Sequence, residues 1–104
     1  MAIAVTESTY YIMLSVLKPN HGYGIIQKVD ELTKGRVMLG PGTLYGAINT
    51  LVSKGWIKLY SEETDSRKKK EYLITDLGRE ILSDEICRLK ELVKNGEREI
   101  GEND

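Results

Sequence analysis

The stretch PGTLYGAINTLVSKGW, residues 41–56, decides the fold of this 104-residue chain. Its apolar side chains recur at the spacing of one helical face, which comprises Leu44, Ala47, Ile48, Leu51 and Val52. The opposite face carries small or polar residues, namely Thr43, Gly46, Asn49, Thr50 and Ser53. We predict a helix that follows a Gly40-Pro41-Gly42 turn and ends at Gly55. Such a helix can bury one side and bring short hydrogen-bonding groups close to a partner with the other.

Two helices are predicted before this stretch. The first begins after Thr6, and its apolar stripe is formed by Tyr10, Met13, Leu14 and Leu17. Pro19 ends it, because a proline disfavours helical geometry in the residue before it. Asn20 is predicted to cap the second helix, which runs to about Thr33. The buried face of that second helix comprises Ile25, Ile26, Val29 and Leu32.

The pattern changes to alternation after the third helix, which predicts strands. Ile57 and Leu59 alternate with other residues, and Tyr72 and Ile74 do so after a polar segment. The two strands form a β-hairpin, and its loop contains the basic run RKKK, residues 67–70.

The last predicted helix starts at Thr75 and Asp76 and carries a heptad seam. The seam consists of Leu82, Ile86, Leu89, Val93, Gly96 and Ile100, at intervals of four and three residues. A seam on a helix that protrudes from a small domain favours pairing with a second copy over packing back onto the domain. Beyond Gly96 we predict a polar tail. Cys87, next to the seam, is predicted to be a buried thiol rather than a redox sensor.

The order of three helices, strand, basic loop, strand and long helix is that of a winged helix-turn-helix. The fold class is therefore α+β and mainly α, with a DNA-binding domain in residues 1–75 and a dimerisation helix with a polar tail in residues 76–104. In such proteins the third helix enters the DNA major groove and the wing touches the adjacent backbone. The candidate DNA-binding residues are Thr43, Tyr45, Asn49, Thr50, Ser53 and Lys54 on the helix, and Arg67, Lys68, Lys69 and Lys70 on the wing.

Each of these residues has a chemical reason to contact DNA and a competing structural one. Short polar side chains reach base edges or phosphates, and basic side chains release counterions from the backbone. Four consecutive basic residues can, however, form no more than a solvated tip, and Tyr45 can pack against the core. A winged-helix module that binds a protein, without sequence-specific DNA binding, is the alternative function.

Composition excludes several other classes. The net charge of −1 is the sum of two unequal halves. Residues 1–75 carry 10 basic and 7 acidic side chains, and residues 76–104 carry 5 basic and 9 acidic ones. A single cysteine excludes an internal disulfide and favours a cytoplasmic location, and no apolar run is long enough to cross a membrane. One histidine and one cysteine cannot form a Cys/His zinc site, and common catalytic motifs are missing. We therefore expect neither a metal nor a cofactor, and no enzyme activity.

Several short motifs together resemble the PadR family of bacterial transcriptional regulators. They are HGY at residues 21–23, GTLYGA at 42–47, KGWI at 54–57, RKKKEY at 67–72 and LITDLG at 73–78. The resemblance covers roughly residues 9–82. It implies a homodimeric repressor that binds an inverted-repeat operator and responds to a planar aromatic molecule near the dimer interface.

The resemblance also implies where the dimer and the effector site lie. The dimer forms through the first and last helices, so the candidate interface residues are Tyr10, Leu82, Ile86, Leu89 and Val93. Tyr10, Tyr11 and Trp56 are the candidate effector-binding residues. Burial in the core explains Trp56 better than a ligand platform does, and core packing is also the more common role for tyrosines such as Tyr10 and Tyr11. His21, beside the predicted cap, is assigned a structural role.

Overall fold

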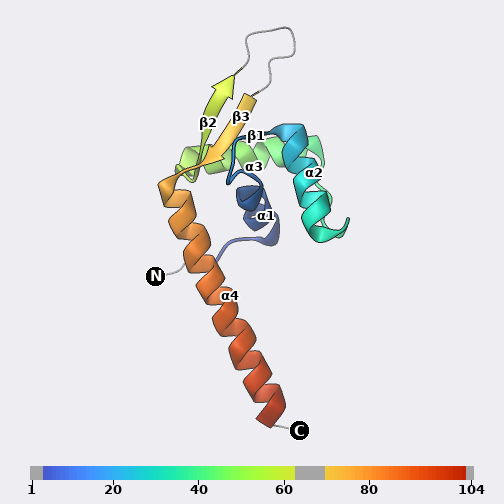
Figure 1. The fold of residues 1–104 in the computed structure, drawn as a ribbon, viewed down its shortest axis with the longest axis vertical. Coiled ribbons are helices and arrows are strands. Elements are labelled where there is room, and N and C mark those ends of the chain that lie inside the picture. The colour runs from blue at the N-terminus through green and yellow to red at the C-terminus, as the bar shows by residue number, and fades with distance from the viewer. Residues whose placement is uncertain (1–3, 63–69, 103–104) are drawn as a thin grey trace.

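Three short helices, a small sheet and one long helix make up the computed structural model, which describes residues 4–62 and 70–102. The elements are α1 (Glu7–Ser15), β1 (Asn20–His21), α2 (Gly22–Thr33), α3 (Pro41–Lys54), β2 (Ile57–Glu62), β3 (Lys70–Ile74) and α4 (Asp76–Glu102). The molecule measures 62 × 30 × 20 Å, because α4 projects far beyond the other elements (Figure 1). The mainly helical content and the hairpin confirm the predicted fold class.

The first helix begins where it was predicted and ends earlier. The Thr6 hydroxyl accepts a hydrogen bond from the Thr9 N–H at 3.2 Å and caps α1. Because α1 stops at Ser15, Leu17 leaves the helical stripe and lies exposed, contrary to the prediction. Ile12 and Val16 are fully buried in the core instead.

The cap of α2 is His21 and not Asn20. His21 Nδ1 accepts a hydrogen bond from the Gly24 N–H at 3.2 Å, which confirms a structural role for this side chain. Asn20 joins the short strand β1, and its amide donates to the Ser15 carbonyl at 3.1 Å. The prediction was wrong because a two-residue strand is stabilised by pairing with a distant strand and leaves no periodic pattern in the sequence.

The core lies between α1, α2, α3 and the sheet. The largest fully buried side chains include Ile12, Met13, Ile25, Leu44, Ile48 and Ile57. Two predicted core residues are exposed, Leu32 at the end of α2 and Val52 on α3. The predicted Gly40-Pro41-Gly42 turn is also corrected, since Pro41 and Gly42 already belong to the first turn of α3, where proline is well tolerated. Gly55 ends α3 as predicted, with a φ of 77°.

The hairpin gains a third strand. β1 pairs antiparallel with β3, and β3 pairs with β2, in the order β1-β3-β2. Ile57 lies opposite Ile74, and Leu59 lies opposite Tyr72, so these four side chains share one face of the sheet. A bulge between Leu59 and Ser61 shifts the register toward the loop end of the hairpin.

The last helix is anchored in the domain and extends just past Ile100, the last residue of the predicted seam. The Thr75 hydroxyl accepts a hydrogen bond from the Gly78 N–H at 3.0 Å and caps α4. The helix passes through Gly96 to Glu102, so the predicted polar tail is helical over these residues. Cys87 is exposed, contrary to the prediction of a buried thiol.

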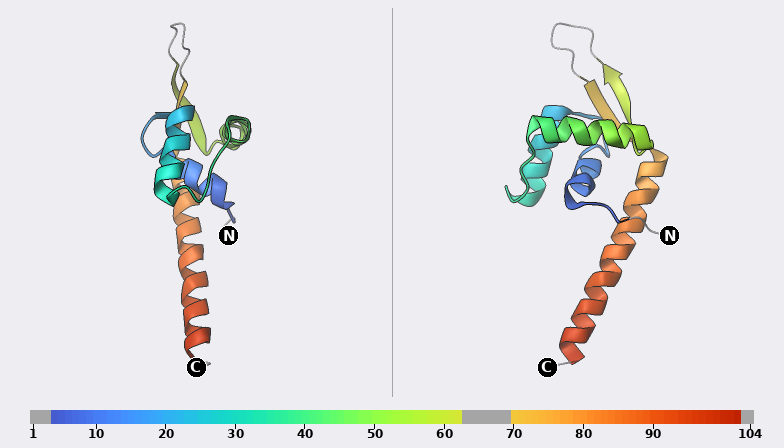
Figure 2. Two further views of the ribbon diagram at one scale, coloured as in Figure 1. Left: turned by 90° about the vertical axis from the view of Figure 1, so that its right-hand side faces the viewer. Right: turned by 180° about the vertical axis from the view of Figure 1, so that it is seen from behind.

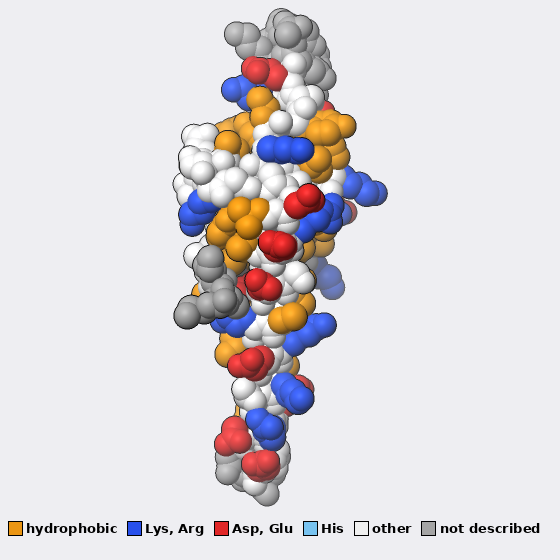
Figure 3. All heavy atoms as spheres, turned by 90° about the vertical axis from the view of Figure 1, so that its left-hand side faces the viewer, with side chains coloured by type: hydrophobic (Ala, Val, Ile, Leu, Met, Phe, Trp, Pro, Cys, Tyr) orange, Lys and Arg blue, Asp and Glu red, His pale blue; other side chains and the backbone are white. Residues whose placement is uncertain are grey.

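The helices α3 and α4 point in different directions. α3 runs across the long axis of the molecule and α4 runs along it, as two further views show (Figure 2). Acidic side chains lie at intervals down α4 with Lys and Arg side chains beside them (Figure 3). Within residues 4–62 and 70–102, no helix is long and apolar enough to cross a membrane.

Candidate nucleic-acid interface

The face of α3 that was predicted to contact DNA is open to solvent. Its exposed residues are Thr43, Tyr45, Gly46, Asn49, Thr50, Ser53 and Lys54. The opposite side of α3 is anchored in the core by Leu44, Ile48 and Leu51, so the backbone behind the exposed face is held firmly. The Thr50 hydroxyl donates to the Gly46 carbonyl at 3.1 Å, which orients it along the helix.

Tyr45 is neither buried in the core nor free of contacts. The residue is 49% exposed, and its hydroxyl lies against the start of α2. A side chain at Gly22 would overlap this hydroxyl, so the glycine leaves room for the tyrosine. The phenol therefore lies beside the N-terminal end of α2, where the helix dipole favours an anion such as a phosphate.

Lys54 and Trp56 form a pair at the end of α3. Trp56 is only 8% exposed and belongs to the core, which confirms the expected burial. The Lys54 Nζ lies 4.7 Å from the centroid of its ring, at cation–π distance. The indole thus holds one basic group at the end of the exposed face.

The wing is described in part. Arg67, Lys68 and Lys69 fall outside the described residues, and Lys70 is the first residue of β3. Lys70 lies opposite Glu62 in the hairpin, with 4.0 Å between the Lys70 Nζ and the Glu62 Oε1. The described strands β2 and β3 lie at the opposite end of the molecule from the C-terminal end of α4 (Figure 1).

A groove separates α3 from the hairpin. It is lined by Asn49, Val52, Ser53, Leu59, Lys70 and Tyr72 and encloses about 420 Å³. Val52 and Leu59 were not among the predicted site residues. Val52 sits at the edge of the apolar stripe of α3, about 70° from its centre, so the helical period alone could not decide between core and surface.

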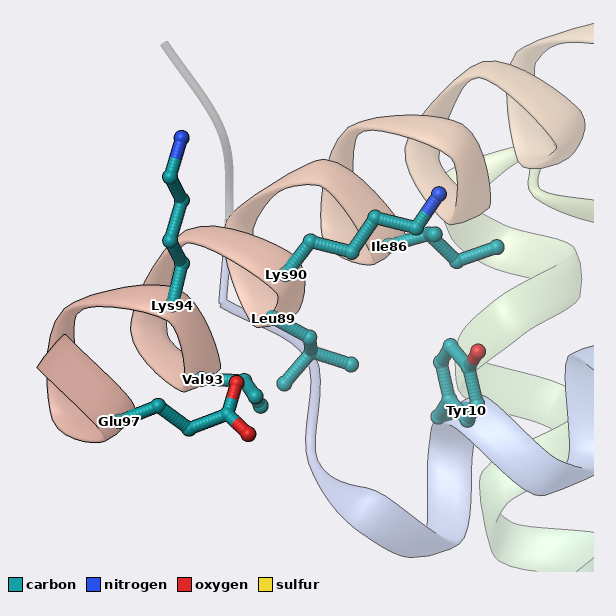
Figure 4. Close-up of a pocket in the computed structure, with 7 residues that line it drawn as sticks. All are labelled: Tyr10, Ile86, Leu89, Lys90, Val93, Lys94 and Glu97. Atoms are coloured by element: carbon teal, nitrogen blue, oxygen red, sulfur yellow. The ribbon is translucent and has the colours of Figure 1, made fainter. Parts of the chain in front are cut away.

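A second surface groove lies between α1 and α4 (Figure 4). Tyr10 faces Ile86, Leu89 and Val93 across it, and Lys90, Lys94 and Glu97 complete the lining. The structure thus brings four of the five candidate dimer residues together. Leu82 is the exception, because it is only 5% exposed and packs into the core of its own chain.

The candidate effector residues fall into two places. The rings of Tyr10 and Tyr11 meet edge to face, with 5.7 Å between their centroids, beside the α1–α4 groove. Trp56 lies in the core and is not among the residues that line this groove. Among the described residues, no cluster of three His, Cys, Asp or Glu side chains could hold a metal ion.

Sequence reasoning missed one buried charged group at the root of α4. Glu85 is buried, and its two carboxylate oxygens accept hydrogen bonds from Arg88 at 2.7 and 2.8 Å. The carboxylate also accepts a hydrogen bond from the Val5 N–H at 3.2 Å, which fastens the N-terminal segment to α4. The guanidinium of Arg88 lowers the pKa of Glu85, and the carboxylate raises the pKa of Arg88. The three-residue spacing of the pair is visible in the sequence, but its burial is not.

Comparison with known proteins assigns the family. Residues 12–84 match the transcriptional regulator PadR-like family. An uncharacterised protein of Lysinibacillus sphaericus is 31% identical over 86 residues, which cover 79% of each chain. A transcriptional regulator from Clostridium thermocellum has a similar structure, with a TM-score of 0.71 and 25% identity over 89% of this chain and 90% of that one. A PadR family transcription regulator from Clostridium difficile also has a TM-score of 0.71, with 28% identity over 88% of this chain and 97% of that one. The chain therefore belongs to the PadR-like family of transcriptional regulators, which are not enzymes.

Proposed function

We propose that this protein is a homodimeric repressor that binds an inverted-repeat DNA operator. The observation that carries the proposal is the exposed polar face of α3 beside a hairpin that leads into a basic loop. In winged-helix proteins these two elements contact the major groove and the adjacent backbone. The excess of basic side chains in residues 1–75 supports an interface with an anion, and the acidic excess lies in residues 76–104.

The base-contacting roles fall to short polar side chains on α3. Asn49 can form two hydrogen bonds with an adenine, while Thr43, Thr50 and Ser53 can reach either bases or phosphates. Tyr45 and Lys54 lie near the two ends of the helix and are suited to phosphate contacts. Arg67, Lys68, Lys69 and Lys70 would neutralise phosphates next to the groove that α3 occupies.

A second copy of the chain is the proposed partner of the α1–α4 groove. Beyond Leu82 the apolar seam of α4 is increasingly exposed, from 36% at Leu89 to 59% at Val93 and 70% at Ile100. A symmetric pair of α4 helices would cover these residues and place Tyr10 of each chain at the interface. Such a dimer holds two α3 helices that can enter successive turns of one face of the duplex, about 34–36 Å apart.

The same groove is the proposed site for a planar aromatic effector. The groove offers apolar and aromatic surface to such a molecule, from Tyr10, Leu89 and Val93, and the Tyr11 ring packs against Tyr10. Binding between the two copies would change the angle between them, and release of the operator would follow.

Selection of duplexes from a random pool by the purified full chain tests the proposal. We expect enrichment of an inverted repeat with half-sites one helical turn apart, and affinity that falls steeply as salt is raised. No enrichment, with equal and salt-insensitive retention of all duplexes, would contradict DNA recognition and favour a protein-binding module instead. Sedimentation of the free protein at the same concentrations reports whether the binding species is a dimer.

A further inference from the structure

The groove between α3 and the hairpin contains an apolar strip on a surface that is otherwise polar. Val52 is 42% exposed on α3, and Leu59 is 46% exposed on β2 across the groove. Tyr72 forms part of the lining and is buried. Asn49 and Ser53 lie beside Val52, and Lys70 lies at the hairpin side. The strip is thus framed by groups that can form hydrogen bonds and by a positive charge.

Val52 lies next to Asn49, at the edge of the face of α3 that is proposed to contact base edges. It follows Asn49 by three positions, and residues three apart are neighbours on a helix surface. A duplex that approaches Asn49 and Ser53 closely therefore also covers Val52. An isopropyl group covered by DNA must meet an apolar part of the nucleic acid, or its burial brings no stabilisation.

The major groove offers one apolar group on the base edges, the C5-methyl group of thymine. We propose that Val52 reads a thymine through this methyl group, with Leu59 on the facing strand shielding the contact from water. The inference rests on the proposed DNA-binding function and names one feature of the operator. Lys70 at the side of the groove is placed to meet the negative charge of the backbone next to that base.

The experiment uses a duplex selected from a random pool by the full-length protein. Each thymine is replaced singly by deoxyuridine, which removes the C5-methyl group and leaves base pairing unchanged. We expect one thymine in each half-site at which this replacement weakens binding about fourfold, the effect of losing one buried methyl-sized group. In the Val52→Ala variant the same replacement should have almost no further effect.

Matched variants separate this contact from a general loss of binding. Leu32→Ala removes an apolar side chain of similar exposure, 45%, from α2 and should retain the full discrimination between thymine and deoxyuridine. Val52→Thr keeps one methyl group and the branched shape, so this variant should retain part of the discrimination between thymine and deoxyuridine. Because Val52 is partly exposed, Val52→Ala should fold, and its circular dichroism and melting temperature verify that.

Three results would overturn the inference. The first is that Val52→Ala still discriminates fully between thymine and deoxyuridine. The second is that no thymine is sensitive to this replacement although the duplex binds specifically. In both cases Val52 does not read a methyl group, and the proposed DNA-binding function stands. If no duplex is selected at all, the proposed function fails together with the inference.

Discussion

Gly78 shows how one missing side chain determines the direction of an entire helix. A Cβ at this position would overlap the backbone carbonyl oxygen of Trp56, which the hydroxyl of Thr75 also contacts at 3.1 Å. Neither the carbonyl nor the helix can move aside easily, because both belong to packed backbone. The close approach at Gly78 therefore seats the first turn of α4 against the junction of α3 and β2.

We predict that Gly78→Ala destabilises the fold by about 1–3 kcal/mol, the usual cost of overpacking a site that cannot relax. Gly46→Ala is the control, since nothing lies within 4 Å of the corresponding Cβ on α3. An alanine there should stabilise the helix by up to about 1 kcal/mol. Urea unfolding of both variants measures the difference, and equal stability of the two would contradict the tight contact at Gly78.

Glu85 makes the attachment of α4 dependent on pH. Its pKa lies below the ordinary 4.5, chiefly because Arg88 donates hydrogen bonds to the carboxylate. A carboxyl group whose pKa is lower in the folded state stabilises the fold above its unfolded pKa, and this contribution is lost as the pH falls through the folded pKa. The contacts with Arg88 and Val5 should therefore weaken on acidification below about pH 4.5.

We predict that Glu85→Gln lowers stability at pH 7 and flattens the loss of stability as the pH falls below about 4.5, because the substituted amide does not titrate. Glu80→Gln, which changes an exposed residue of the same helix, should leave the stability at pH 7 nearly unchanged. Denaturant unfolding across this pH range provides the measurement. A Glu85→Gln profile that parallels the wild type would show that this carboxyl group does not control the acid response.

At the scale of elements, α3 and the hairpin are proposed to divide the work of recognition between them. The wing carries charge that can neutralise phosphates irrespective of base sequence, whereas α3 carries amide and hydroxyl groups that can distinguish bases. Separate substitutions in the two elements should therefore have different signatures.

We predict that reversing Lys68, Lys69 and Lys70 to Glu weakens binding to all duplexes and lowers the slope of log affinity against log salt by up to about three. Asn49→Ala should change the preferred base at one position of each half-site and leave the salt slope unchanged. Titration of labelled duplexes at several salt concentrations distinguishes the two. Unchanged affinity after the triple charge reversal would remove the wing from the interface.

The elements also show what a sequence can and cannot predict. Thr6, Gly55 and Thr75 were predicted as helix boundaries because caps depend on local chemistry. β1 was not predicted, because only its pairing with β3 makes Asn20 and His21 a strand. The seam to Ile100 was predicted from its periodicity, and α4 indeed continues without a break past Gly96. There the length of α4 and local contacts such as the 2.6 Å hydrogen bond from Arg98 to Asn95 outweigh the modest cost of one glycine.

The same distinction applies to the candidate site. The exposed residues of α3 follow from helical period and polarity, so they were predicted correctly as a surface. Val52 was misplaced because it lies at the edge of the apolar stripe of α3, where the position of a neighbouring element decides burial. Leu82 lies within the seam but packs into the core of its own chain, and Cys87 lies about 130° from the centre of the seam and is exposed. Their burial depends on the hairpin, the core and the direction of α4, none of which periodicity describes.

At the scale of the whole molecule, α4 is proposed to join two copies. We predict that Val93→Asp converts the dimer to monomers, because a carboxylate would have to be buried in an apolar seam. Affinity for an inverted repeat should then fall to that of a single half-site. Sedimentation equilibrium and titration of full and half operators measure both effects.

Asn95→Asp serves as the control, since it adds the same charge two residues further along α4, on the opposite face of the helix. It should leave both the mass and the affinity near those of the wild type. A Val93→Asp protein that remains a dimer would place the dimer contact elsewhere on the chain.

The helix α4 is long, unbroken and attached to the rest of the domain at one end only. Its 27 residues correspond to about 40 Å of rigid helix, seated at one end beside Gly78 and Glu85. If two such helices are joined along their lengths, a pivot of about 10° at the seat beside Gly78 swings the 14-residue helix α3, whose far end lies about 20 Å from the seat, by about 4 Å, roughly one base-pair step. The contacts that seat α4 beside Gly78 and Glu85 would then fix the distance between the two α3 helices, and with it the preferred half-site spacing, although these contacts lie away from the DNA.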